Sequence, residues 1–125
     1  QEHTMNIPIP AFIPRPVPTI LVAALILVAV LLPGSSLPDA PGIPGFDKIV
    51  HFILFGSLAV AARRDFGLAA RRQLLTALVA AVLFSALTEA LQLLVDGRSS
   101  ELVDMVADLA GFAAGLLLTR VRRPG

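Results

Sequence analysis

Residues 74–95 read LLTALVAAVLFSALTEALQLLV, and this stretch decides the fold. Glu89 is its only charged residue, and apolar residues do not alternate with polar ones as they do in a barrel strand. A helix rises about 1.5 Å per residue, so about 20 apolar residues cross the roughly 30 Å hydrocarbon core of a membrane. The stretch therefore predicts a membrane-spanning helix.

Three further apolar segments lie at residues 18–32, 46–62 and 102–121. The 125-residue chain is 56% hydrophobic and 15% charged, its mean hydropathy is +0.83, and its length allows one domain. The first segment follows Arg15 as a signal peptide would, but no A-x-A-like cleavage site follows it, so we expect a retained helix. We predict an all-α, polytopic membrane protein, a bundle of four transmembrane helices within residues 18–123.

Positive charges predict how this bundle is oriented. Cytoplasmic segments of membrane proteins carry an excess of Lys and Arg. Eight arginines precede the first segment, separate the second from the third, or follow the fourth: Arg15, Arg63, Arg64, Arg71, Arg72, Arg120, Arg122 and Arg123. Lys48 and Arg98 are the two basic residues near the opposite ends of the segments. We therefore expect both termini in the cytoplasm and the protein in the bacterial inner (cytoplasmic) membrane.

Residues 1–17 form an N-terminal arm in which prolines recur at short intervals, among them Pro8, Pro10, Pro14 and Pro16. Proline at this density excludes a helix and favours extended backbone. We expect a lead-in that lies on the membrane surface rather than an arm that docks a partner. Met5 is a candidate natural start, which makes residues 1–4 a candidate non-native remnant outside the fold.

Composition excludes several classes of function. The formal net charge is +1, and the chain carries neither a nucleic-acid-binding motif nor a Gly-rich phosphate loop, so we expect no nucleic-acid partner. The chain has no cysteine, which excludes disulfides and thiolate metal sites. Membrane lipids are the partners that remain, together with other membrane proteins.

Four titratable residues interrupt the apolar segments: His51, Glu89, Asp104 and Asp108. Counted from the outer segment ends, His51 lies roughly 7 Å deep and Glu89 and Asp108 roughly 9 Å, with Asp104 nearer the rim. An ionisable group in hydrocarbon costs about 2.5–3.5 kcal/mol on insertion scales, so it persists when it is paired or used. We predict a polar site in the outer leaflet, with these four residues as acid/base or orienting groups.

Three neighbouring polar residues are candidates for binding an anionic headgroup: Lys48, Gln92 and Arg98. Small residues at every fourth position of the last segment predict that another helix approaches it closely: Ala107, Gly111 and Gly115. Taken singly, none of these polar residues is decisive, because each can also be an interhelical hydrogen-bonding group, a helix cap or a turn residue. Their common depth is what favours a functional pocket.

Four short motifs follow one another in the chain: Asp47-Lys48-Ile49-Val50-His51-Phe52, Thr88-Glu89-Ala90-Leu91-Gln92, Gly97-Arg98-Ser99-Ser100 and Asp104-Met105-Val106-Ala107-Asp108-Leu109-Ala110-Gly111. They resemble the pattern K-x-x-H-F, E-x-x-Q, G-R and D-x-x-x-N-x-x-G of VanZ-like membrane proteins, over roughly residues 15–121. Asp108 stands where that pattern has Asn, and an acid there must be protonated, salt-bridged or metal-bound. The resemblance implies a small membrane protein connected with resistance to the glycopeptide antibiotic teicoplanin, without a defined reaction.

Two main hypotheses follow for the function. In the first, the protein binds or processes an anionic envelope lipid or lipid-linked precursor, with Lys48 and Arg98 on the phosphate and Glu89 and His51 as acid/base groups. In the second, it is a non-enzymatic accessory subunit of a larger membrane complex, and the acids lock its helices together. The chain has no nucleophilic serine elbow, so catalysis stays open, as does the oligomeric state. A proton pathway is a weaker hypothesis, because the cytoplasmic half lacks matching acids.

A metal site is a further alternative. One histidine and three carboxylates, His51, Glu89, Asp104 and Asp108, suit Zn²⁺ or Mn²⁺. No segment, however, carries two ligands of the H-E-x-x-H kind. We therefore predict no cofactor.

Overall fold

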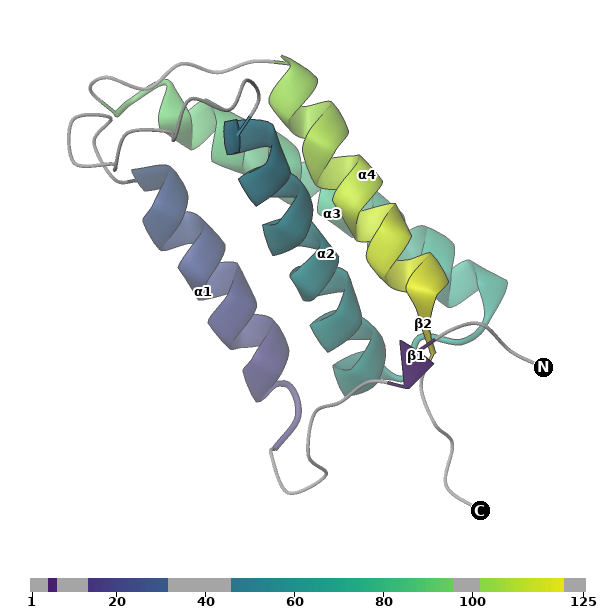
Figure 1. Ribbon diagram of the computed structural model, residues 1–125. Coiled ribbons are helices and arrows are strands. Elements are labelled where there is room, and N and C mark those ends of the chain that lie inside the picture. Colours follow the sequence, from purple (N-terminus) through teal and green to yellow (C-terminus); the bar gives the residue numbers. More distant parts are fainter. Residues whose placement is uncertain (1–4, 7–13, 32–45, 96–101, 121–125) are drawn as a thin grey trace.

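The computed structural model describes residues 5–6, 14–31, 46–95 and 102–120. Four helices fill most of these ranges: α1 (Val17–Leu31), α2 (Phe46–Phe66), α3 (Arg71–Gln92) and α4 (Leu102–Leu118) (Figure 1). Two short strands, β1 (Met5–Asn6) and β2 (Thr119–Arg120), pair in parallel, with Met5 opposite Thr119. The all-α, four-helix fold is therefore confirmed, and the short strand pair is an addition that the sequence did not indicate.

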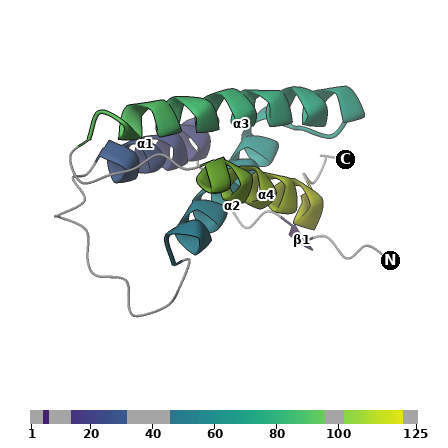
Figure 2. The same ribbon diagram turned by 90° about the horizontal axis from the view of Figure 1, so that it is seen from above.

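The helices form a ring in which α2 packs against α1 and α4, and α3 packs against α4 and α1. Successive helices run in opposite directions, so α2 and α4 are parallel to each other and antiparallel to α1 and α3 (Figure 1). Seen from above, α2 and α4 lie together on one side of α3 (Figure 2). The first turns of α2 and α4 and the last turns of α3 consequently meet at the same end of the bundle.

Glycines allow α2 and α4 to touch backbone to backbone. A Cβ at Gly111 would overlap the carbonyl oxygen of Phe52, and a Cβ at Gly115 would overlap that of Gly56. The predicted close approach at the small residues of α4 is thus confirmed for Gly111 and Gly115. Phe52 follows His51 directly in the sequence, so this contact also brings His51 towards α4.

The ends of α2, α3 and α4 differ from the expected segment ends by three or four residues, and α4 ends at Leu118, where β2 follows it. The second helix continues to Phe66 because Gly67 adopts a left-handed conformation, with φ of 59°, and the Leu68 amide then bonds the Arg63 carbonyl at 3.1 Å. This geometry ends a helix, because the amide bonds to one of the last carbonyls, which lack partners within the helix. The third helix starts at Arg71, because the Gln73 side chain accepts bonds from the amides of Ala69 and Ala70 at 3.0 and 2.9 Å.

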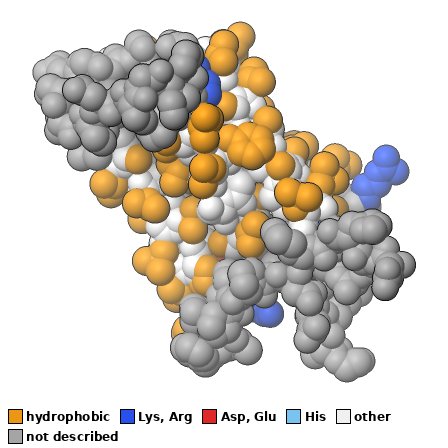
Figure 3. Space-filling model, in the orientation of Figure 1, with side chains coloured by type: hydrophobic (Ala, Val, Ile, Leu, Met, Phe, Trp, Pro, Cys, Tyr) orange, Lys and Arg blue, Asp and Glu red, His pale blue; other side chains and the backbone are white. Residues whose placement is uncertain are grey.

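The bundle places polar side chains inside and large apolar side chains outside. Its small apolar core contains Phe55, whose ring lies 5.8 Å from that of Phe84. Buried beside this core are Ser85, Thr88, Glu89, Gln92, Asp104 and Asp108. The surface, in contrast, exposes many leucines, with Leu94 at 82%, Leu102 at 77% and Leu117 at 75% (Figure 3). Soluble proteins distribute these residue types in the opposite way.

Among the described residues, α3 is the helix that is both long and apolar enough to cross a membrane. The first helix is apolar but has 15 residues, and α4 has 17. The second has 21 residues but carries charged ones at both ends. The four crossings and the cytoplasmic termini therefore stay predictions.

Candidate functional site

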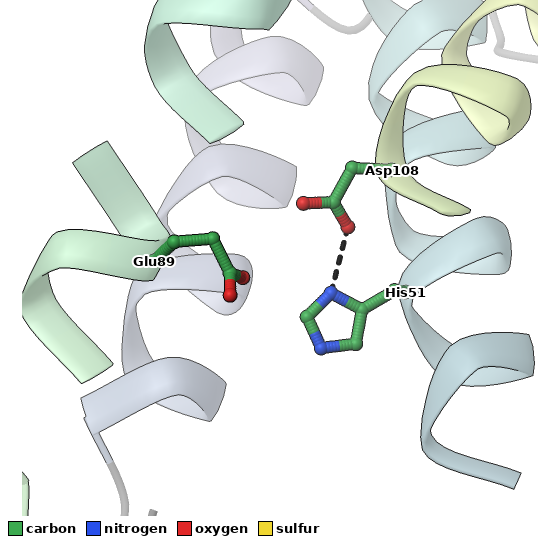
Figure 4. A group of neighbouring side chains, drawn as sticks. All are labelled: His51, Glu89 and Asp108. Atoms are coloured by element: carbon green, nitrogen blue, oxygen red, sulfur yellow. Dashed lines mark hydrogen bonds and ion pairs between the residues drawn. The ribbon is translucent and has the colours of Figure 1, made fainter. Parts of the chain in front are cut away.

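His51, Glu89 and Asp108 meet inside the bundle, although each comes from a different helix. One ligand-type atom from each of the three side chains lies within 4.8 Å of the other two. Figure 4 shows the Glu89 carboxylate pointing from α3 towards Asp108 of α4 and His51 of α2. The structure thus brings together three of the four residues that we expected to act as acid/base or orienting groups.

Asp108 is the centre of the hydrogen bonding at this site. Its side chain is fully buried, and its Oδ1 lies 2.7 Å from Nδ1 of His51. The Ser85 hydroxyl donates to its Oδ2, also at 2.7 Å. Both oxygens of the buried carboxylate therefore have a partner, and the two bonds connect α4 with α2 and α3. This is the pairing that an acid at this depth requires.

These contacts limit the chemistry that the site can perform. A carboxylate accepts hydrogen bonds, so Nδ1 of His51 carries the proton when Asp108 is ionised, and Nε2 keeps a lone pair in the neutral ring. Ser85 bonds to the aspartate and not to the histidine. The three residues are therefore not a Ser-His-Asp triad, in which the histidine must contact the serine. What they offer is an oriented imidazole beside two carboxylates.

Lys48 and Asp104 form an ion pair next to this cluster. The Nζ of Lys48 lies 3.0 Å from Oδ1 of Asp104, and the side chains are 26% and 6% exposed. The contact has the distance of an ion pair but not the angles of a hydrogen bond, since Oδ1 has no hydrogen-bond partner among the described residues. Lys48 lies one turn before His51 on α2, and Asp104 lies one turn before Asp108 on α4. The pair thus occupies the rim of the site, and Asp104 and Glu89 both act electrostatically on His51.

The remaining predicted binding residues have different outcomes. Gln92 is buried, one turn after Glu89 on α3, so it belongs to the polar interior. Arg98 lies outside the described residues. Lys48 is near the site, but its ammonium group is engaged with Asp104.

Ser85 is the member of the site that the sequence analysis missed. It lies four residues before Glu89, on the same face of α3, and is fully buried. Its spacing of one helical turn from Glu89 is the feature of the sequence that could have indicated Ser85 as a member of the site. Thr88 lies nearby but bonds back to the Ser85 carbonyl at 2.8 Å, so its hydroxyl is used within its own helix.

A second polar cluster at the opposite end of α2 was also missed. The Asp65 carboxylate accepts bonds from the Thr19 amide and hydroxyl at 2.8 and 2.6 Å and from Arg64 at 2.9 Å. Asp65 follows the expected membrane span of 46–62. Burial would raise the pKa of this carboxyl, but the bonds from Thr19 and Arg64 outweigh burial and lower it. The cluster ties α1 to α2 and does not resemble a binding site.

Arg63 serves a related structural purpose. Its guanidinium donates to the carbonyl of Leu68 at 2.9 Å and to the carbonyls of Leu116 and Thr119. Carbonyls at the C-terminus of a helix lack intrahelical partners, so this side chain completes the end of α4. Arg63, from which we predicted only the orientation of the bundle, therefore also holds the helices together.

Comparison with known proteins gives a family and no closer relative. No curated protein and no solved structure matches the chain. A model of the family described as VanZ/LLP1 matches residues 8–123, which include all four helices and every residue of the site. This extent agrees with the resemblance carried by the four motifs. The chain belongs to the VanZ/LLP1 family.

Proposed function

We propose that this protein is a multi-pass protein of the bacterial inner membrane that binds or processes an anionic envelope lipid or lipid-linked precursor. The binding site is the polar cluster of His51, Glu89 and Asp108, open towards the outer leaflet. The observation that carries the proposal is the meeting of these three side chains, from three helices, in the interior of a bundle whose outer surface is apolar.

The distribution of side chains supports the membrane location. Large apolar residues are exposed on all four helices, among them Leu25, Ile53, Leu83 and Leu117. In water such a surface would promote aggregation, whereas in lipid it costs nothing. The buried acids face one another instead of the surface, as ionisable residues in membrane segments do.

The arrangement of charges supports a lipid headgroup as the ligand. Lys48 stands at the rim, where a phosphate arriving from the membrane surface would first meet the site. Arg98 is one residue of the sequence motif G-R and is assigned here, with Lys48, to the headgroup. His51 and Glu89 lie deeper and are the groups that can exchange a proton with the bound ligand. The proposal includes a link to tolerance of glycopeptide-type antibiotics, which the resemblance to VanZ-like proteins supports.

Native mass spectrometry of the protein in mild detergent tests this function. We expect the wild type to retain a phospholipid or a polyprenyl phosphate and Glu89→Gln to lose most of it. Asp65→Asn is the matched control, because it also neutralises a buried carboxylate, but at the other end of α2. Equal lipid retention by all three proteins, or none by the wild type, would contradict the proposal.

The second candidate is an accessory subunit in which the polar residues only hold the bundle together. The chain of bonds from Ser85 through Asp108 to His51 favours it, because these bonds connect three helices. In this case Glu89→Gln and His51→Ala lower the unfolding temperature without changing bound lipid. A protein partner that co-purifies in stoichiometric amount is the positive result expected for this alternative.

A further inference from the structure

We propose that His51, Glu89 and Asp108 bind one divalent metal ion of the Zn²⁺ or Mn²⁺ class, against our expectation of no cofactor. A second step, which rests on the proposed function, assigns this ion to the phosphate of the lipid headgroup. The metal site itself stands on the geometry alone.

The geometry is that of a ligand set brought together from three helices. One donor atom from each residue lies within 4.8 Å of the other two, a spread that modest side-chain rotation closes around an ion with bonds of about 2.0–2.2 Å. Figure 4 shows the Glu89 carboxylate across from the imidazole ring, whose Nδ1 faces Asp108. The sequence argued against a metal because no helix carries a pair of ligands of the H-E-x-x-H kind. That argument does not apply when each helix supplies one.

The chemistry of the three residues selects the class of ion. An imidazole nitrogen with two carboxylates suits Zn²⁺ or Mn²⁺, whereas Mg²⁺ and Ca²⁺ prefer ligand sets made of oxygen alone. The set is also neutral overall when it holds a divalent ion and a neutral imidazole.

Ser85 acts as a positioning residue for this site. Its hydroxyl holds Oδ2 of Asp108 at 2.7 Å, which leaves Oδ1, on the side of His51, to bind the ion in place of the present hydrogen bond. Ligating carboxylates are themselves commonly hydrogen-bonded, and loss of such a partner reduces metal affinity by about 10–100-fold.

Three protein ligands leave a coordination position open, as in catalytic zinc sites. A phosphate oxygen can occupy this position. The ion would thereby supply positive charge in the deep part of the site, where the described residues are two carboxylates and a histidine, while Lys48 at the rim is paired with Asp104. This explains how an acidic pocket attracts an anionic ligand.

The test is a metal titration of the full chain, purified in detergent without a polyhistidine tag. After treatment with EDTA, Zn²⁺ or Mn²⁺ is added, excess ion is removed, and bound metal is counted by plasma mass spectrometry. We expect about one ion per chain in the wild type. A folded wild-type protein that retains no stoichiometric metal would overturn the inference.

Variants locate the ion. We expect Glu89→Gln and His51→Gln to weaken binding by at least about 10-fold, Ser85→Ala by about 10–100-fold, and Asp65→Asn to leave it unchanged. Mn²⁺ electron paramagnetic resonance gives a readout that a merely destabilised fold does not imitate, because it reports the ligands of the ion. Wild-type affinity in Glu89→Gln and His51→Gln would overturn the site, even if metal binds elsewhere.

Lipid binding is measured on the same samples, so that the two proposals fail separately. If lipid is retained by a protein that never binds metal, the lipid function stands and the metal site is wrong. If metal binds and no lipid does, the metal site stands and the lipid function is wrong. When lipid retention falls on EDTA treatment and returns with Zn²⁺ or Mn²⁺, both steps are supported.

Discussion

Asp108 occupies a position where the VanZ-like pattern has asparagine, and the two residues can make nearly the same contacts. As a carboxylate, Asp108 accepts bonds from both Ser85 and His51. An asparagine oxygen still accepts from Ser85, and its amide can donate to Nδ1 if the histidine moves its proton to Nε2. The hydrogen bonds therefore do not require an acid here, whereas a divalent ion gains a charged ligand from it.

Two substitutions of Asp108 distinguish the contribution of its hydrogen bonds to stability from the contribution of its charge. We expect Asp108→Ala to lower the free energy of unfolding by about 1–3 kcal/mol for each polar group that loses its partner. Asp108→Asn should cost clearly less, because both partners are kept. Unfolding of the purified variants in detergent, followed by circular dichroism, measures the difference. Equal losses in the two variants would show that the charge of Asp108, and not its hydrogen bonds, stabilises the bundle.

The common level of His51, Glu89 and Asp108 in the bundle could be predicted from the sequence, but not all of their partners. The level follows from counting residues along a helix, because the rise per residue is fixed. Partners depend on how each helix is rotated, and packing decides this. Ser57 and Thr76 bond to their own helix, to the carbonyls of Ile53 and Arg72, as such residues commonly do in helices. In the sequence, only the spacing of one helical turn to Glu89 distinguishes Ser85 from these two residues.

At the level of elements, the contact between α2 and α4 controls the geometry of the site. Gly111 lies three residues after Asp108 and packs on the backbone of Phe52, next to His51. A change that separates the two helices here must also lengthen the 2.7 Å contact between His51 and Asp108. The close packing at Gly111 therefore sets the distance between the side chains of the site.

Replacement of Gly111 by alanine tests this coupling. The added methyl group would overlap the Phe52 carbonyl, which is backbone and cannot rotate away. We expect a loss of about 1–3 kcal/mol in the free energy of unfolding, as for other overpacked contacts. Ala110→Val is the control, because Ala110 is exposed on the same helix and such changes usually stay within about 0.5 kcal/mol. An unchanged stability in Gly111→Ala would show that the helices lie further apart than described.

Helix ends were the least predictable part of the elements. The apolar segments show where helices are, but Arg63, Arg64 and Asp65 look like loop residues and belong to α2. Asp65 accepts a bond from Thr19, and Arg63 donates to a carbonyl at the end of α4; both contacts join residues distant in the sequence. Hydropathy alone cannot reveal such contacts, so the expected end at residue 62 was too early.

For the whole molecule, we predict that all four helices cross the membrane. The family match and the apolar surface agree with a membrane protein, and within the described ranges α3 is the helix that satisfies both length and composition. A helix of 15 residues such as α1 spans about 22 Å, less than the roughly 30 Å hydrocarbon core. Bilayers accommodate short helices by local thinning at modest cost. Four crossings would place eight arginines on one side, as the excess of Lys and Arg in cytoplasmic segments favours.

The absence of cysteine makes this prediction directly testable. Single cysteines at Ser36, Ala70 and Ser99 report the positions of the three connections in spheroplasts treated with a membrane-impermeant maleimide. With four crossings and cytoplasmic termini, Ser36→Cys and Ser99→Cys are labelled at once, whereas Ala70→Cys is labelled only after permeabilisation. If α3 alone crosses, Ser36 and Ala70 share one side and Ser99 lies on the other. Labelling of Ala70→Cys alone would mean that the bundle is inverted, and the polar site would then face the cytoplasm, out of reach of an envelope lipid in the outer leaflet.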